Sequence, residues 1–263
     1  KTFGKFSFRN REKFITDIQT QGYAILNDVL APDFISRAKP ALAEAIEKEA
    51  AYHGTTSYSD YGMVLLCSLY NRVFVDLFDN KCLTDPFNAV LGEGCIVYAY
   101  TSSSMPPNKT NYSARVHVDC PRLIPGYVTN MGATIALDDF CEDNGATWFL
   151  PASHTQENAP SRDEFFGRSK RFVAPAGSVL FFNARLWHAG GSNFTPNWRH
   201  ALTINMCRPY MKQRIDIPRA MSHMDMTGVS ETALQKLGFH SQVPASYDEY
   251  YVEPEKRKFK QRT

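Results

Sequence analysis

The feature that most constrains the fold is a change of pattern at Cys95. From there on, short apolar runs are separated by turn-forming residues, among them Asp143-Asn144-Gly145 and Pro175-Ala176-Gly177. Such runs predict β-strands, here at residues 95–101, 114–119, 131–137, 146–150, 171–174, 178–183 and 201–208. A set of short strands that follows a helical segment predicts a double-stranded β-helix, the jelly-roll barrel.

The residues before Cys95 follow the helical period. Phe14, Ile15 and Ile18 recur at helical spacing, and Gly22 is typical of a residue just after a helix end. The sequence further predicts a strand at 23–26, a helix from Pro32 that kinks or starts at Pro40, a helix over 64–78, and a helix capped by Thr84-Asp85-Pro86. We expect one mainly β, α+β domain over 1–263, with helices (8–92) outside a cupin-like barrel (95–210) and a C-terminal extension (211–263).

Composition narrows the class of protein. Hydrophobic residues make up 43% of the chain, enough for a large core, and the net charge of +2 argues against a nucleic-acid partner. No stretch reaches the ~18 consecutive apolar residues of a membrane span, and the N-terminus lacks the apolar core of a signal peptide. None of the six cysteines forms a CxxC pair, which indicates free thiols in a reducing compartment. We expect a cytoplasmic protein that binds neither nucleic acid nor a membrane.

Two residues of one predicted strand, His117 and Asp119, indicate a metal site. Side chains two apart on a strand point to the same face, so both can reach one ion, and Arg115 shares that face. A second histidine, His188, follows the apolar run 179–182. Two histidines and one carboxylate are the donor set of non-haem iron(II) oxygenases, which leaves open positions on the metal.

Further motifs accompany these residues in order. They are the opening Gln21-Gly-Tyr-Ala-Ile-Leu-Asn-Asp-Val-Leu30, the Asn144-Gly145 turn, Pro151-Ala-Ser-His154, and Arg199, which lies eleven residues after His188. In combination, over about residues 10–215, they resemble the phytanoyl-CoA dioxygenase (PhyH-like) family of iron(II)/2-oxoglutarate-dependent oxygenases. The resemblance implies Fe(II) as cofactor and 2-oxoglutarate and dioxygen (O2) as cosubstrates.

The resemblance also implies roles for single residues. His117, Asp119 and His188 match the iron ligands, and Arg199 matches the arginine that binds the distal carboxylate of 2-oxoglutarate through two charge-assisted hydrogen bonds. Thr134 is a second candidate contact of the cosubstrate.

The chain departs from the family pattern in two places. The family's Pro-Gly-Ser-His element reads Pro151-Ala-Ser-His154 here, where His154 is interpreted as a turn histidine. The serine that many members carry two residues after the distal histidine is Gly190 here. Thr134 or Ser192 compensates for it, or the cosubstrate binds more weakly.

The implied reaction is hydroxylation of an unactivated C–H bond with release of succinate and carbon dioxide. Asp119 argues against halogenation, because the halogenating relatives carry a small residue in its place. Desaturation, epoxidation or oxidative cyclisation in secondary metabolism stay open. A non-catalytic β-barrel binding protein would be expected to lose a ligand or Arg199, and a zinc hydrolase gives Arg199 no role.

The substrate is predicted from basic and polar residues near these motifs. The candidates are Arg115, Arg122, Tyr127, Asn205 and Arg208, with Lys109 and Arg219 as further ones. Together they indicate a small anionic or zwitterionic metabolite as the partner, and a homodimer stays open. Residues 58–63 and 211–226 are candidate lids over the site.

Overall fold

Two antiparallel sheets form the centre of the computed structural model, which describes residue 6, residues 8–257 and residue 259. The larger sheet has the order β1 (Tyr23–Leu26), β6 (Val179–Asn183), β3 (Asn130–Ala136), β8 (Ala201–Cys207) and β2 (Ile96–Ser102). The smaller has the order β5 (Lys170–Arg171), β4 (Trp148–Phe149) and β7 (His188–Ala189). Phe140, Phe149, Phe172 and Phe182 belong to one buried cluster, so the two sheets pack against each other.

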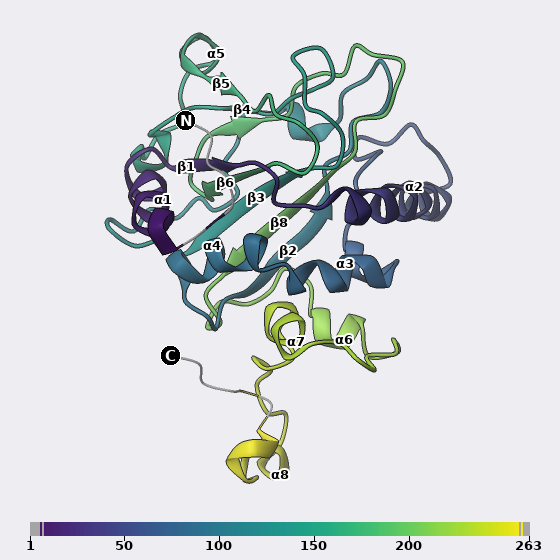
Figure 1. Ribbon diagram of the computed structural model, residues 1–263, viewed down its shortest axis with the longest axis vertical. Coiled ribbons are helices and arrows are strands. Elements are labelled where there is room, and N and C mark those ends of the chain that lie inside the picture. Colours follow the sequence, from purple (N-terminus) through teal and green to yellow (C-terminus); the bar gives the residue numbers. More distant parts are fainter. Residues whose placement is uncertain (1–5, 7, 258, 260–263) are drawn as a thin grey trace.

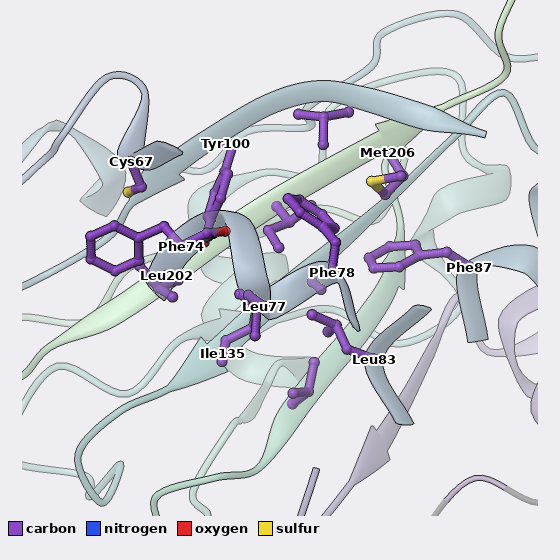
Figure 2. Packing of buried hydrophobic residues seen from close by; sticks show 14 of the residues in the cluster. Cys67, Phe74, Leu77, Phe78, Leu83, Phe87, Tyr100, Ile135, Leu202 and Met206 are labelled. Carbon is purple, nitrogen blue, oxygen red and sulfur yellow. Dashed lines mark hydrogen bonds between the residues drawn. The ribbon is translucent and has the colours of Figure 1, made fainter. Parts of the chain in front are cut away.

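Helices cover the other face of the larger sheet (Figure 1). They are α1 (Phe8–Thr20), α2 (Pro32–His53), α3 (Arg72–Asp76) and α4 (Lys81–Leu91). Phe74, Phe78 and Phe87 lie between these helices and the sheet, close to Tyr100 and Met206 (Figure 2). The ring centroids of Phe78 and Tyr100 are 5.6 Å apart, an edge-on contact typical of aromatic cores.

Strand β3 shows how the sequence separates the two faces of the sheet. Met131, Ala133 and Ile135 are part of the core on the helical side, whereas Thr134 faces the opposite side. A Cβ added to Gly132 would lie 2.3 Å from the ring of Phe182, so the space that this glycine leaves is filled by that ring.

Several element predictions are wrong. Residues 64–78 form a 3₁₀ turn (Cys67–Leu69), the short helix α3 and another 3₁₀ turn (Leu77–Asp79) instead of one helix. The last helix of this region begins after Asn80, whose side chain accepts a hydrogen bond from the Cys82 N–H, so Thr84-Asp85-Pro86 lie inside it. Helix α2 begins at Pro32, as predicted, and the alternative start at Pro40 is wrong, because Pro40 lies inside the helix.

The strand predicted over 114–119 is wrong as well. Tyr112–Ala114 form a 3₁₀ turn, and only His117 makes a β-bridge, which pairs it with His188 beside the smaller sheet. The N–H groups of Asp119 and Cys120 both donate to the Ala184 carbonyl, at 2.9 and 3.0 Å. These backbone bonds, and not a regular strand, fix the segment.

The C-terminal extension packs on the helical side of the molecule. It contains α6 (Ile217–Ala220), α7 (Glu231–Leu237) and α8 (Tyr247–Tyr250), and α8 lies at the end that is furthest from the sheets (Figure 1). Ile217, Met221 and Leu237 are part of the helical-side core, which holds most of the candidate lid 211–226 away from the smaller sheet. None of the helices in the described ranges is both long and apolar enough to cross a bilayer.

Candidate active site

His117, Asp119 and His188 meet at the inner face of the larger sheet. Their potential donor atoms all lie within 4.8 Å of one another. Asp119 Oδ1 is 3.6 Å from His117 Nε2 and 3.7 Å from His188 Nε2. The two histidines are held side by side because their backbones exchange hydrogen bonds of 2.9 and 3.0 Å. One carboxylate oxygen and two imidazole nitrogens therefore converge on one point.

Hydrogen bonds orient both imidazoles for a metal. His117 Nδ1 lies 2.7 Å from the Arg115 carbonyl, and His188 Nδ1 lies 2.9 Å from the Leu186 carbonyl. Because a carbonyl only accepts, each Nδ1 must carry the proton, which leaves the Nε2 lone pair of the neutral ring free. The donor set thus fits iron(II) in chemistry and tautomer.

The protonation states of His188 and Asp119 agree with this assignment. Burial and the neighbouring His117 lower the pKa of His188 to about 4, so its imidazole is neutral at pH 7. Burial would raise the pKa of Asp119, but the adjacent imidazoles of His188 and His117 and the amide of Asn205 favour the ionised form, so the pKa is lowered. The carboxylate is therefore ionised, the form that binds a cation.

Asn205 binds the Asp119 carboxylate through Oδ2, while Oδ1 is the oxygen close to the two histidines. Its side-chain amide donates to Asp119 Oδ2 at 3.2 Å and accepts from Asn130 at 3.1 Å. Asn205 lines the cavity, as predicted for a substrate residue, but its amide is engaged with Asp119. It is therefore a positioning residue for the candidate metal ligand Asp119.

We expect Asn205→Ala to weaken metal binding. Loss of an outer partner of a ligand typically costs about 10- to 100-fold in metal affinity. Anaerobic titration with iron(II) measures the effect. Thr203→Val is the matched control, because Thr203 lies on the same strand and lines the same cavity but bonds to Ser103 and not to a ligand. An unchanged iron(II) affinity in Asn205→Ala would show that Asp119 needs no such support.

Arg199 lies in the same cavity, almost wholly buried at 2% exposure. Its Nη1 donates to the Ser103 carbonyl at 3.0 Å and its Nη2 to the Gly145 carbonyl at 3.1 Å, so the predicted Asn144-Gly145 turn helps to place it. Burial lowers the pKa of Arg199 to about 9, which still leaves it charged at pH 7. Its Nε has no hydrogen-bond partner and no carboxylate forms an ion pair with it among the described residues.

A small cavity of about 120 Å³ joins these groups. Its wall is rich in hydroxyls, and the residues that line it are Met63, Tyr98, Ala99, Thr101, Ser102, Ser103, Tyr112, Ser113, His117, Asp119, Thr134, Thr147, Phe182, His188, Gly190, Arg199, Thr203, Asn205 and Arg214. The candidate cosubstrate contact Thr134 is among them. Of the candidate lid 58–63, only Met63 reaches the cavity.

The position of Gly190 explains one departure from the family pattern. A Cβ at Gly190 would lie 2.5 Å from the Ser113 hydroxyl and 2.7 Å from Met105, so a serine there would not fit without a shift. Ser113 places its hydroxyl at this point from another segment. Ser192, suggested by the sequence, is not part of the cavity wall.

The remaining substrate candidates lie elsewhere. Arg115 is exposed, with its guanidinium carbon 5.7 Å from the Tyr112 ring centroid. Arg122 and Tyr127 line a second cavity of about 510 Å³. Arg208 donates to the carbonyls of Val128, Leu91 and Val90, so its guanidinium stabilises the fold. Lys109 and Arg219 are exposed and outside the metal cavity.

Comparisons with known proteins agree with this geometry. A family model described as phytanoyl-CoA dioxygenase matches residues 18–201. The uncharacterized protein Rv1501 of Mycobacterium tuberculosis is 28% identical over 247 residues, which cover 91% of this chain and 90% of that protein. The dioxygenase trt7 of Aspergillus terreus is 25% identical, over 78% of this chain and 77% of that one.

A solved structure gives the same answer for the fold. The non-haem alpha-ketoglutarate-dependent carbocyclase SnoK from nogalamycin biosynthesis matches with a TM-score of 0.61 at 20% identity, over 75% of this chain and 84% of that one. At this identity the likeness concerns the fold alone. It confirms the predicted α+β, jelly-roll class.

Proposed function

This chain belongs to the phytanoyl-CoA dioxygenase family, and on that premise we propose that it hydroxylates an unactivated C–H bond of a small anionic or zwitterionic metabolite. Iron(II), 2-oxoglutarate and dioxygen, the cofactor and cosubstrates predicted from the sequence, are those of this family. Together they supply the oxidising chemistry, with succinate and carbon dioxide as coproducts, while the protein binds and orients.

The observation that carries the proposal is that one cavity holds both a set of metal donor atoms and a buried positive charge. His117, Asp119 and His188 offer three converging donor atoms, and Arg199 offers a buried charge that forms no ion pair with a carboxylate of the described residues. A buried cation without a counter-ion is costly unless a ligand supplies the anion. The distal carboxylate of 2-oxoglutarate meets that need, so Arg199 would bind the cosubstrate while the triad holds iron(II).

The other cavity residues would position these groups. Thr134 presents a hydroxyl that can donate to a bound carboxylate. Phe182, whose ring centroid is 4.9 Å from that of His188, keeps one side of the site apolar.

A zinc hydrolase fits less well. Among the described residues that line the cavity, Asp119 is the only carboxylate, so no separate general base is available to activate water. A non-catalytic barrel is also disfavoured, because all three ligands and Arg199 are present. Oxidative cyclisation remains the second candidate, favoured by the shared fold with a carbocyclase.

The test is a metabolite screen with the iron(II)-loaded protein. Amino acids, carboxylic acids and phosphorylated metabolites are incubated with 2-oxoglutarate and oxygen, and succinate release is measured together with the product mass. We expect a subset of anionic compounds to stimulate succinate release and to gain one oxygen atom. Loss of two hydrogens would identify desaturation or cyclisation instead, and protein that forms no succinate with or without any compound would contradict the proposal.

A further inference from the structure

Arg214 is the second arginine of the metal cavity. It comes from the C-terminal extension and not from the barrel, and it lines the cavity together with Tyr98 and Tyr112. Among the described residues that line this cavity, Arg199 and Arg214 are the only arginines, and no lysine is present. Arg199 is buried, whereas Arg214 is exposed to solvent.

The backbone of Arg214 is fixed by an irregularity in β2. Val97 pairs with Met206 and Ala99 with Asn205, so Tyr98 is an extra residue, a β-bulge. The freed Tyr98 carbonyl accepts the Arg214 N–H at 2.9 Å. The neighbouring Gln213 side chain donates to the Val97 carbonyl at 2.8 Å and to the Leu237 carbonyl at 3.1 Å.

The side chain of Arg214, in contrast, is unengaged. Its guanidinium forms no hydrogen bond or ion pair with any residue in the described ranges. A long side chain whose backbone is fixed at a cavity wall, and whose charge has no partner there, is available to a ligand.

The sum of the charges in the cavity indicates which kind of ligand Arg214 would bind. With iron(II) and doubly charged 2-oxoglutarate bound, the charges of the metal, Asp119, Arg199 and the cosubstrate cancel. The guanidinium of Arg214 then remains as the net charge of the cavity. We propose, resting on the function proposed above, that Arg214 binds an oxyanion of the prime substrate, a carboxylate or a phosphate monoester, and so determines substrate specificity.

Binding without turnover gives the first test. Wild type, Arg214→Met and Lys212→Met are loaded with iron(II) and 2-oxoglutarate without oxygen, and thermal unfolding is followed with two sets of compounds. One set pairs carboxylic and amino acids with their amides, and the other pairs phosphate monoesters with their parent alcohols. Lys212→Met is the matched control, because it removes an exposed charge two residues away that does not line the cavity.

We expect Tm to rise with members of one anionic set and not with their neutral partners. The rise should disappear in Arg214→Met and persist in Lys212→Met, and the set that responds distinguishes carboxylate from phosphate. The inference is overturned if the rise persists in Arg214→Met, if neutral partners act equally, or if no anion stabilises the wild type.

Turnover of a compound found in this way gives the second test. The KM of that compound should rise about 10- to 100-fold in Arg214→Met, as for loss of a charged hydrogen bond, with a smaller change in kcat. A matching rise in the 2-oxoglutarate Kd would mean that Arg214 serves the cosubstrate, which also overturns the inference. Wild type that binds no 2-oxoglutarate refutes the proposed function itself, whereas anion binding that is independent of Arg214 refutes only its role.

Discussion

An Asp119→Ala variant is expected to lose tight iron(II) binding and, with it, substrate oxidation coupled to succinate release. Asp119 is the only carboxylate among the described residues of the cavity wall, and its Oδ1 lies 3.6 and 3.7 Å from the two imidazole nitrogens that complete the donor set. Removing an outer partner of a ligand costs about 10- to 100-fold in metal affinity, so removal of the ligand itself should exceed about 100-fold. Anaerobic iron(II) titration and a succinate assay measure both effects.

The variant must be shown to fold. Asp119 is half-buried and accepts a hydrogen bond from Asn205, so alanine should lower the unfolding temperature of the metal-free protein by only a few degrees. Asp163→Ala, which removes an exposed carboxylate in the first turn of α5 (Arg162–Arg168), is the control for loss of a negative charge. Hydroxylation at the wild-type rate in Asp119→Ala would refute the ligand assignment.

The candidate metal ligands and Arg199 could be predicted because they follow short sequence patterns. The other residues around the cavity could not, because folding brings them there from distant segments. His117 and Asp119 are close in sequence, and His188 and Arg199 follow at recognisable spacing, so short-range patterns contain the information. Ser113 fills the space beside Gly190 from a segment 77 residues earlier, a contact that only the folded chain creates.

Arg214 illustrates the same limit. It reaches the cavity because a bulge at Tyr98 frees a carbonyl for its N–H, and a bulge leaves no clear trace in hydrophobic periodicity. The basic residues that sequence proximity suggested include Arg208, which the fold uses to bind the last carbonyls of α4.

The strands were predictable where the residue type alternates along the chain, whereas helix ends that depend on a capping side chain were not. β3 and β8 have a polar or small residue at every second position on the cavity side, and both strands were located to within about one residue. Residues 64–78 are mostly apolar, which favoured one helix. Asn71 and Asn80 instead cap separate helices by accepting N–H groups two residues on, and a cap interrupts a helix that apolar spacing alone would continue.

Arg199→Met is expected to raise the Kd of 2-oxoglutarate by roughly 100-fold or more while iron(II) affinity stays near the wild-type value. Breaking a buried charge pair by removal of one partner costs about 3–5 kcal/mol, and every 1.4 kcal/mol is about tenfold in affinity. The guanidinium is suited to this role because its charge is buried, its Nε is unpaired, and Phe140 packs against it with 4.2 Å from Cζ to the ring centroid. Anaerobic calorimetric titration of the iron(II)-loaded protein measures the Kd.

Two further variants separate binding from support of the fold. Arg199→Lys keeps the charge but cannot form the two-pronged contact, so its 2-oxoglutarate Kd should fall between those of the wild type and Arg199→Met. Arg185→Met is the matched control, because Arg185 is also buried and also donates to backbone carbonyls, those of Pro121 and Gln156, yet lies outside the metal cavity. Arg185→Met should lower the unfolding temperature and leave the 2-oxoglutarate Kd unchanged. If Arg199→Met likewise lowers the unfolding temperature and leaves the 2-oxoglutarate Kd unchanged, Arg199 only stabilises the fold and other groups bind the cosubstrate.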